Sequence, residues 1–213
     1  KNKDTKMLLT PGPTPVPEFV RKAMADITIH HRTEEFEAIF KNTRELLIEI
    51  YDMPEVVMLA SSGTGAMEAC VTNLTHKKAL TINSGKFGER FGKICAAFGI
   101  DYTEIKNEWN TPVSVEAVVE AIKADSSIDA VFIQICESAG GLRHPVEEIA
   151  AEIKKINKDI TIVADGITAV GVEKIDTTNL DAVVTGSQKA FMLPPGLAMI
   201  GLSNDAVAKI ESK

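Results

Sequence analysis

Short apolar runs alternate with longer amphipathic stretches along most of this 213-residue chain. Seven runs rich in Val, Ile and Leu are typical of buried strands: 56–60, 79–83, 102–105, 130–136, 160–165, 181–185 and 197–202. Stretches with helical spacing separate most of them: 33–51, 65–74, 87–98, 114–123 and 145–157. Because strands and helices alternate, crossover connections must join the strands. The sequence therefore predicts an α/β fold with three αβα layers around a mostly parallel, mixed sheet of about seven strands.

The residues at the starts of the helical stretches agree with this pattern. Thr33 and Ser114 can cap the helices that follow them, and Pro145 suits a first-turn position. Prolines hold the segment 10–17 in an extended path before a helix that begins at Glu18. Six apolar side chains of the stretch 33–51 share one helical face: Phe36, Ile39, Phe40, Leu47, Ile50 and Tyr51. We expect an extended arm over residues 1–16 and one large domain over residues 17–213.

Composition excludes several classes of protein. The chain has 30 acidic and 23 basic residues, a net charge of −7, and no long basic run, so nucleic acid is not an expected partner. With 45% hydrophobic and 25% charged residues it is globular, and no run approaches the roughly 18 apolar residues of a membrane helix. Cys70, Cys95 and Cys136 are widely spaced among apolar neighbours, as reduced core thiols are. We expect a cytoplasmic protein without a membrane partner.

Polar residues gather where the predicted strands end, in the segments 61–65, 83–88, 137–141, 165–166 and 186–189. Ligands of open parallel sheets bind beyond the carboxyl ends of the strands, so these segments form one set. Ser62, Gly63 and Thr64 would direct backbone N–H groups, hydroxyls and a helix N-terminus at one point, which suits a phosphate. A plain strand-to-helix turn is the alternative. A dinucleotide fold is disfavoured because Glu68 replaces its third glycine and Asn83 replaces its ribose-binding acid.

Asp165 and Lys189 are the two charged residues of this set that point to chemistry. Asp165 ends an apolar strand, and a buried carboxylate needs a cation or several donors, so either a cationic pyridine nitrogen or the following turn would satisfy it. Lys189 precedes Ala190 and Phe191, and partial desolvation would favour the neutral amine that attacks aldehydes. A solvated surface charge is the alternative for this lysine. The lysine, the aspartate and a phosphate cup together are what pyridoxal phosphate requires.

These residues resemble the class V, fold type I aminotransferases, in particular the alanine, serine and glyoxylate or pyruvate aminotransferase branch. The resemblance runs through the segments 8–14, 31–36, 62–69, 83–90, 165–166, 186–190 and 194–196. It implies that Lys189 forms a Schiff base with pyridoxal 5'-phosphate and that Asp165 pairs with the pyridinium nitrogen. It also implies that Phe87 stacks on the ring, that Ser138 lies near the ring hydroxyl, and that the phosphate contacts Ser62, Gly63, Thr64 and Gln188. Gly12 then lies in the arm that approaches the substrate carboxylate.

The activity implied by the resemblance is ping-pong transamination by a homodimer, from alanine or serine to glyoxylate or pyruvate. A lyase or desulfurase on the same fold is the alternative within the cofactor class, and a catalytically silent binding module is the alternative outside it. Family members continue into a smaller C-terminal domain, so we expect this chain to be the large domain of a longer protein. The segment 137–141 lacks the usual hydroxyl residues, and Glu137 is expected to bond backbone groups, with a general acid as the alternative. His30 and His31 lack a third ligand, so no metal site is expected.

Overall fold

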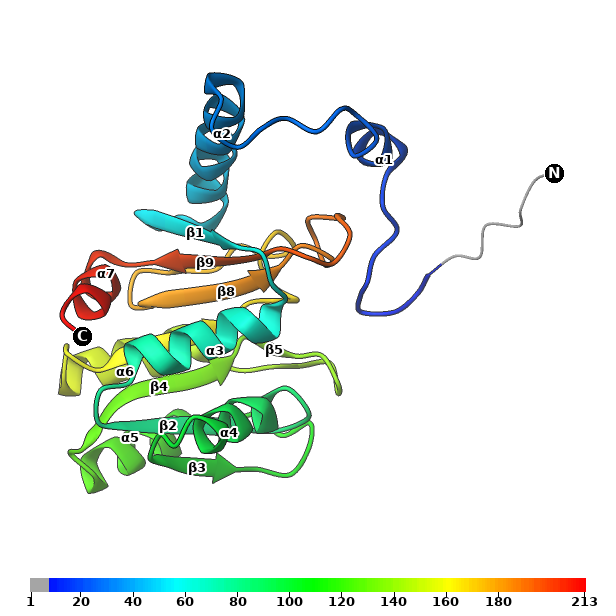
Figure 1. Cartoon of the computed structure of the whole chain (residues 1–213). Coiled ribbons are helices and arrows are strands. Elements are labelled where there is room, and N and C mark those ends of the chain that lie inside the picture. Colours follow the sequence, from blue (N-terminus) through cyan, green and yellow to red (C-terminus); the bar gives the residue numbers. More distant parts are fainter. Residues whose placement is uncertain (1–7) are drawn as a thin grey trace.

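The computed structural model describes residues 8–213, and the first seven residues of the expected arm lie outside the described part. A seven-stranded sheet in the order β1-β9-β8-β7-β4-β2-β3 forms the middle layer (Figure 1). Its strands are β1 (Glu55–Leu59), β2 (Lys78–Asn83), β3 (Tyr102–Lys106), β4 (Ile128–Gln134), β7 (Thr161–Asp165), β8 (Ala182–Gly186) and β9 (Ala198–Leu202). Neighbours pair in parallel except β9, which is antiparallel to both β1 and β8. The predicted mostly parallel, mixed sheet is confirmed.

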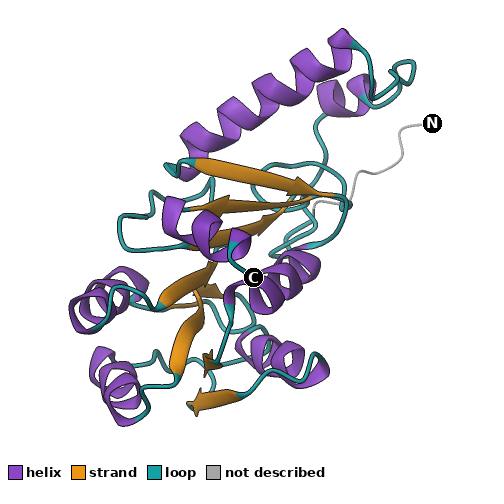
Figure 2. Cartoon of the chain, turned by 60° about the vertical axis from the view of Figure 1, so that its left-hand side comes forward, coloured by secondary structure: helices purple, strands orange, loops and turns teal. Residues whose placement is uncertain are grey.

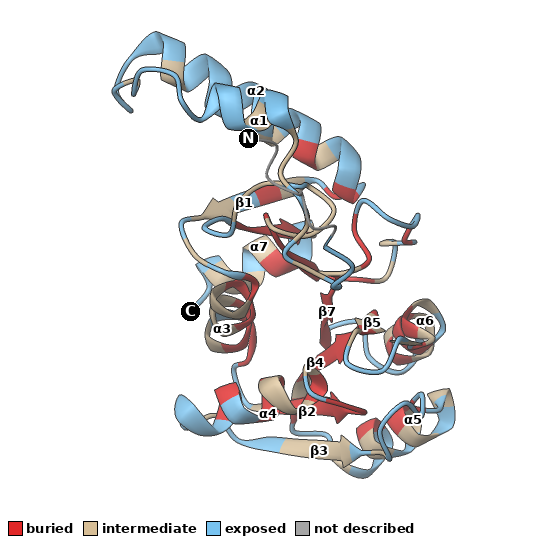
Figure 3. Ribbon diagram, turned by 90° about the vertical axis from the view of Figure 1, so that its right-hand side faces the viewer, coloured by how far each residue is buried: buried red, intermediate tan, exposed pale blue. Residues whose placement is uncertain are grey.

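Helices cover both faces of this sheet, and Figure 3 shows the strands between two groups of helices. The helices are α1 (Glu18–Ala23), α2 (Glu34–Tyr51), α3 (Gly63–Leu74), α4 (Gly88–Ala97), α5 (Val115–Ala124), α6 (Val146–Ile156) and α7 (Asn204–Glu211). Alternate residues of one strand serve opposite faces: Val131 packs with α5 and α6, and Phe132 packs with α3 and α4. The two resulting apolar cores make the arrangement the predicted three-layer αβα fold.

Local capping fixes where several helices begin. Thr33 Oγ1 accepts a hydrogen bond from the Phe36 N–H at 3.3 Å, and Ser114 Oγ accepts one from the Ala117 N–H at 3.1 Å. Both predicted caps are confirmed, as is the helix start at Glu18. Pro145 lies at the N-cap of α6, one position before the first turn where it was expected. Helix α7 has a similar cap that was not predicted: Ser203 Oγ accepts a hydrogen bond from the Ala206 N–H at 3.1 Å.

The segment after β4 departs from the prediction that this strand continues to residue 136. The strand ends at Gln134, and the Ile135 N–H donates to the Asp165 carbonyl at 2.9 Å. The chain then forms a short antiparallel pair between β5 (Cys136–Glu137) and β6 (Leu142–Arg143). Residues 136–137 thus pair with residues 142–143 instead of continuing β4 along the sheet. The hairpin places residues 138–141 beyond the carboxyl end of β4.

Helix α2 projects beyond the sheet, as Figure 2 shows, and only its last turns reach the core. Leu47 and Tyr51 are buried, whereas Ile39, Phe40 and Ile50 are about half exposed. Of the six apolar side chains that share the predicted helical face, only Leu47 and Tyr51 are therefore part of the core. No helix within residues 8–213 combines the length and the apolar character needed to cross a membrane.

Candidate active site

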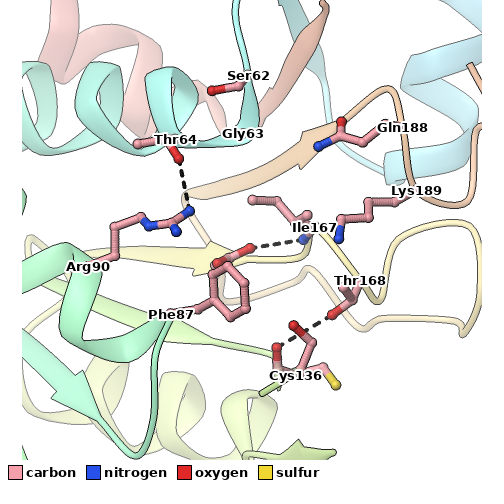
Figure 4. A pocket seen from close by; sticks show the side chains of 12 residues that line it. Ser62, Gly63, Thr64, Phe87, Arg90, Cys136, Ile167, Thr168, Gln188 and Lys189 are labelled. Carbon is pink, nitrogen blue, oxygen red and sulfur yellow. Dashed lines mark hydrogen bonds between the residues drawn. The ribbon is translucent and has the colours of Figure 1, made fainter. Parts of the chain in front are cut away.

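A pocket opens at the carboxyl ends of the parallel strands, where the sequence places its polar set (Figure 4). Its empty volume is about 460 Å³, a figure that includes open solvent at its mouth. All predicted site residues except Gly12 line it: Ser62, Gly63, Thr64, Phe87, Ser138, Asp165, Gln188 and Lys189. They follow or end five different strands, so the topology of the sheet, rather than nearness in sequence, brings them together.

The start of α3 forms one wall of the pocket. Ser62 is the N-cap residue, but its side chain makes no capping hydrogen bond, and the first intrahelical bond in this turn is donated by the Ala66 N–H. The N–H groups of residues 63–65 therefore lack carbonyl partners within the helix. Thr64 Oγ1 accepts a hydrogen bond from Arg90 Nη1 at 2.9 Å, which leaves the hydroxyl hydrogen of Thr64 for another acceptor. This wall is suited to an anion.

Asp165 lies at the bottom of the pocket as the last residue of β7 and is 4% exposed. Its Oδ1 accepts a hydrogen bond from the Ile167 N–H at 3.0 Å. Burial raises the pKa of the carboxyl to about 6, and the charge of Glu137 adds to this effect, while Arg90 and Lys189 oppose it. A buried carboxylate with so few donors is suited to a cationic partner.

Lys189 faces the pocket from the opposite side, beneath the N-terminal arm. Its Nζ donates a hydrogen bond to the Pro11 carbonyl at 2.8 Å, and a Cβ on Gly12 would lie 2.5 Å from the same Nζ. Thr14 binds the arm down, because its N–H donates to the Gln188 carbonyl at 3.0 Å and its hydroxyl donates to the Lys189 carbonyl at 2.9 Å. Gly12 thus lies outside the pocket lining but in contact with the lysine. Desolvation lowers the pKa of Lys189, and Arg90 lowers it further, while Asp165 raises it.

Four residues that line the pocket were not predicted: Arg90, Cys136, Ile167 and Thr168. The Arg90 guanidinium lies 4.8 Å from the centroid of the Phe87 ring. The spacing of three residues between Phe87 and Arg90 at a helix start was the available signal, because such residues share a face. Ile167 and Thr168 lie in the turn after β7, and their only signal was nearness to Asp165 in sequence.

The cysteine prediction needs one correction. Cys70 and Cys95 are buried core thiols, and burial raises their pKa values to about 12 and about 11. Cys136 is partly exposed in the pocket lining instead, because β4 ends before it and the hairpin takes it out of the core. Within residues 8–213, no three His, Cys, Asp or Glu side chains are grouped so that they could hold a metal ion.

Comparison with known proteins places the chain in a family. Residues 8–212 match the family described as Aminotransferase class-V. An uncharacterized aminotransferase of Helicobacter pylori strain J99 is 50% identical over 97% of this chain and 56% of its own length. An L-aspartate–glyoxylate aminotransferase of Paracoccus denitrificans is 30% identical over 96% of this chain and 54% of its own length. The solved structure of an aspartate aminotransferase of subgroup IV from Thermus thermophilus has a TM-score of 0.89 and 31% identity, and covers 96% of this chain and 59% of that one. The chain spans a little more than half the length of these relatives, and it belongs to the class V aminotransferase family.

Proposed function

We propose that this chain is the cofactor-binding large domain of a transaminase that uses pyridoxal phosphate. The donor is a small amino acid, alanine or serine, and the acceptor is a 2-oxo acid, glyoxylate or pyruvate. One observation carries the proposal: the Lys189 amine, the buried Asp165 carboxylate and the open N-terminus of α3 line a single pocket. Family membership supports transamination as the reaction class.

The residues of the pocket fit pyridoxal phosphate. The free N–H groups at the start of α3 and the uncommitted Ser62 hydroxyl supply donors for a phosphate dianion. Gln188 also lines the pocket, and its side-chain amide can donate from Nε2 to a phosphate oxygen. The Phe87 ring offers an apolar surface for stacking, and Ser138 is the hydroxyl on the hairpin side of the pocket. The proposed contacts thus give partners to the N–H groups that the start of α3 leaves uncapped.

When bound, the cofactor supplies an aldehyde and a protonated ring that withdraws electrons from the carbon losing its proton. Asp165 holds the proton on the ring nitrogen, because the ionised carboxylate and the cationic ring each lower the other's cost of burial. The protein must therefore keep Asp165 ionised, and Arg90 and Lys189 favour that state by their charge. The buried position of Asp165 at the end of β7 limits its contact with water.

Lys189 has two tasks in this proposal. Its lowered pKa increases the fraction of neutral amine at neutral pH, which is the form that attacks the cofactor aldehyde. With the cofactor and an amino acid bound, the Lys189 amine would serve as the base that takes the proton from the substrate α-carbon and as the acid that returns it on the cofactor side. The Pro11 carbonyl and the Gly12 backbone limit where the amine can move, because they lie directly against Nζ. The arm thus lies against the lysine side chain, which remains only partly buried.

A second copy of the chain is the partner we propose. Apolar side chains are exposed on α1, on the segment that follows it and on α2: Phe19, Met24, Ile27, Ile39, Phe40, Leu46 and Ile50. Single exposed apolar side chains are normal on a protein surface, but seven from three consecutive segments favour a protein–protein interface.

The three cysteines are free thiols in this structure, which supports a reducing, cytoplasmic location.

A desulfurase is a second candidate, and Cys136 is the observation that favours it. Its thiol lines the same pocket as Lys189 and is partly exposed. A desulfurase would convert free cysteine to alanine and leave a persulfide on a protein thiol. Incubation with cysteine followed by mass spectrometry of the peptide around residue 136 would detect that persulfide, and a peptide of unchanged mass would remove this candidate.

Nitrogen transfer tests the proposed function. The intact protein that carries this chain is loaded with pyridoxal phosphate and given glyoxylate with ¹⁵N-alanine, ¹⁵N-serine or ¹⁵N-aspartate. We expect ¹⁵N-glycine to form from alanine or serine and to disappear in Lys189→Ala. Formation from aspartate alone would correct the donor but keep the reaction class. A parallel reaction supplies pyruvate in place of glyoxylate, with ¹⁵N-serine as donor. If cofactor is bound at Lys189 but neither ¹⁵N-glycine nor ¹⁵N-alanine forms, a silent binding module is favoured.

A further inference from the structure

Glu137 is a fully buried carboxylate beside the pocket that the proposed reaction does not use. As expected from the sequence, it bonds backbone groups rather than solvent. Its Oε2 accepts hydrogen bonds from the N–H groups of Phe87 and Gly88, both at 2.8 Å. Its Oε1 accepts one from the Ala139 N–H at 3.1 Å. One carboxylate therefore joins two loops that enter the pocket, one carrying Phe87 and the other carrying Ser138.

Helix α4 depends on this carboxylate for its N-terminal cap. Phe87 is the N-cap residue and has no side chain that can accept a hydrogen bond, so the first N–H groups of the helix need an acceptor from elsewhere. Glu137 supplies that acceptor from β5, and its negative charge is favoured by the positive end of the helix dipole. A helix start that is capped across the fold is fixed relative to the strand that caps it. Phe87 is the residue fixed in this way.

The Phe87 backbone is held on its other side as well. Gln134, the last residue of β4, donates from Nε2 to the Phe87 carbonyl at 3.2 Å. Gln134 is fully buried, as is Glu137, so neither side chain exchanges its bond with water. The N–H and the carbonyl of one residue are thus bound by two buried side chains of the segment 134–137. This is more restraint than capping of a helix requires.

Gly85 makes room for the carboxylate. A Cβ at this position would lie 2.6 Å from Glu137 Cγ and 2.7 Å from Cδ, distances that real contacts do not reach. The loop before α4 therefore has a glycine where the Glu137 side chain passes beneath it. Any side chain at position 85 would therefore have to displace the Glu137 side chain.

We propose that Glu137, with Gln134, is a positioning residue that presents the Phe87 ring to the cofactor of the proposed transaminase. The inference rests on the proposed function, because the ring has a task only when the cofactor is bound. Glu137 does not touch the reacting atoms in this account. Its hydrogen bonds act on the cofactor through Phe87, so this effect depends on the presence of the aromatic ring. Its charge has a separate effect that does not need the ring, because it opposes ionisation of Asp165.

Glu137→Gln tests the proposal in the intact protein that carries this chain. The variant keeps the shape of the side chain but turns one acceptor oxygen into an NH₂ group that faces backbone donors. We expect pyridoxal phosphate to bind about tenfold more weakly, as the loss of one charge-assisted bond predicts. We also expect the visible circular dichroism per bound cofactor to fall, because the ring no longer holds the cofactor in one asymmetric orientation.

Asp129→Asn is the matched control. The Asp129 carboxylate also accepts three backbone hydrogen bonds, from residues 76, 77 and 78 at 3.0 to 3.1 Å, but it lies at the amino end of β4. We expect it to lower thermal stability at least as much as Glu137→Gln and to leave both cofactor readouts unchanged. Equal cofactor defects in the two variants would show general destabilisation and overturn the proposal.

A double-mutant cycle with Phe87→Ala tests whether Glu137 acts through the ring. If it does, the Glu137→Gln/Phe87→Ala variant binds cofactor no more weakly than Phe87→Ala alone, because the two changes remove the same contact and loss of the Glu137 charge favours ionised Asp165. If the double variant binds cofactor more weakly than Phe87→Ala by the same factor that Glu137→Gln shows alone, the proposal is overturned. Failure of both the unaltered protein and Asp129→Asn to take up cofactor would overturn the proposed function, and this inference with it.

Discussion

The side chain of Lys189 lies directly on the backbone of Gly12, 177 positions earlier in the chain. A Cβ on Gly12 would come within 2.5 Å of both Cδ and Nζ of the lysine, and Nζ donates to the Pro11 carbonyl. The arm and the reactive amine are therefore one structural unit, although the sequence separates them by almost the whole domain. Any side chain at position 12 must displace the amine from its place.

Gly12→Ala is expected to impair attachment of the cofactor. Gly12 has a φ of +131°, so the new methyl group adds backbone strain as well as contact with Lys189. We expect the yield of cofactor-modified Lys189 after borohydride reduction to fall, because the methyl group displaces the end of the Lys189 side chain; a cost of about 1.4 kcal/mol corresponds to about a tenfold fall.

Gly196→Ala separates contact from strain. Gly196 has a φ of +148°, but a Cβ there would meet no atom within 4 Å. This variant should therefore lose a similar amount of stability and keep the attachment of cofactor to Lys189. A comparable loss of attachment in both variants would contradict the role assigned to the contact.

Asp165→Asn is expected to stabilise the cofactor-free protein at neutral pH. Burial raises the pKa of Asp165 from 3.8 to about 6, so the folded state holds this proton more tightly than the unfolded state does. The cost is absent below pH 4, grows as the pH rises from about 4 to 6, and then stays near 3 kcal/mol, an order-of-magnitude figure. Urea unfolding at pH 4, 5, 6 and 7.5 measures the difference. A gain in stability that is as large at pH 4 as at pH 7.5 would show that the carboxyl charge is not its cause.

His144 is expected to have the opposite pH dependence. Burial lowers its pKa from 6.5 to about 4, and the neutral ring accepts a hydrogen bond from the Val113 N–H at 3.2 Å. Its contribution is fully present above pH 6.5 and is lost as the pH falls towards 4, by about 3 kcal/mol in order of magnitude. His144→Asn keeps an acceptor near the Val113 N–H but does not titrate. Its unfolding free energy should decline less between pH 6.5 and 4, and an equally steep decline would refute the assignment.

Sequence reasoning worked where the signal is local. Thr33 and Ser114 were identified as caps because a hydroxyl before an amphipathic stretch acts within one turn, and both make the expected bond. The order of strands and helices likewise predicted the layers, since crossover connections leave few topologies. The site segments converge for the same reason, because residues that follow parallel strands meet at one edge.

The relationships that were missed join positions far apart in the sequence. Cys136 was expected in the core because it follows an apolar run, but it pairs in a hairpin with Arg143, seven residues later, and the strand ends before it. Glu137 was expected to bond backbone groups, yet its partners at residues 87 and 88 have no local signal. Helix α2 has an apolar face, yet Ile39, Phe40 and Ile50 on that face are exposed. Periodicity in the sequence shows that a face is apolar, but it does not show what packs against that face.

The central claim is that Lys189 is the amine that binds pyridoxal phosphate. The most direct test incubates the intact protein that carries this chain with pyridoxal phosphate, reduces it with borohydride, and locates the pyridoxyl group by mass spectrometry of its peptides. We predict that the modification is confined to Lys189 and that Lys189→Ala remains folded and unmodified. Modification spread over exposed lysines, or full turnover by Lys189→Ala, would contradict the claim.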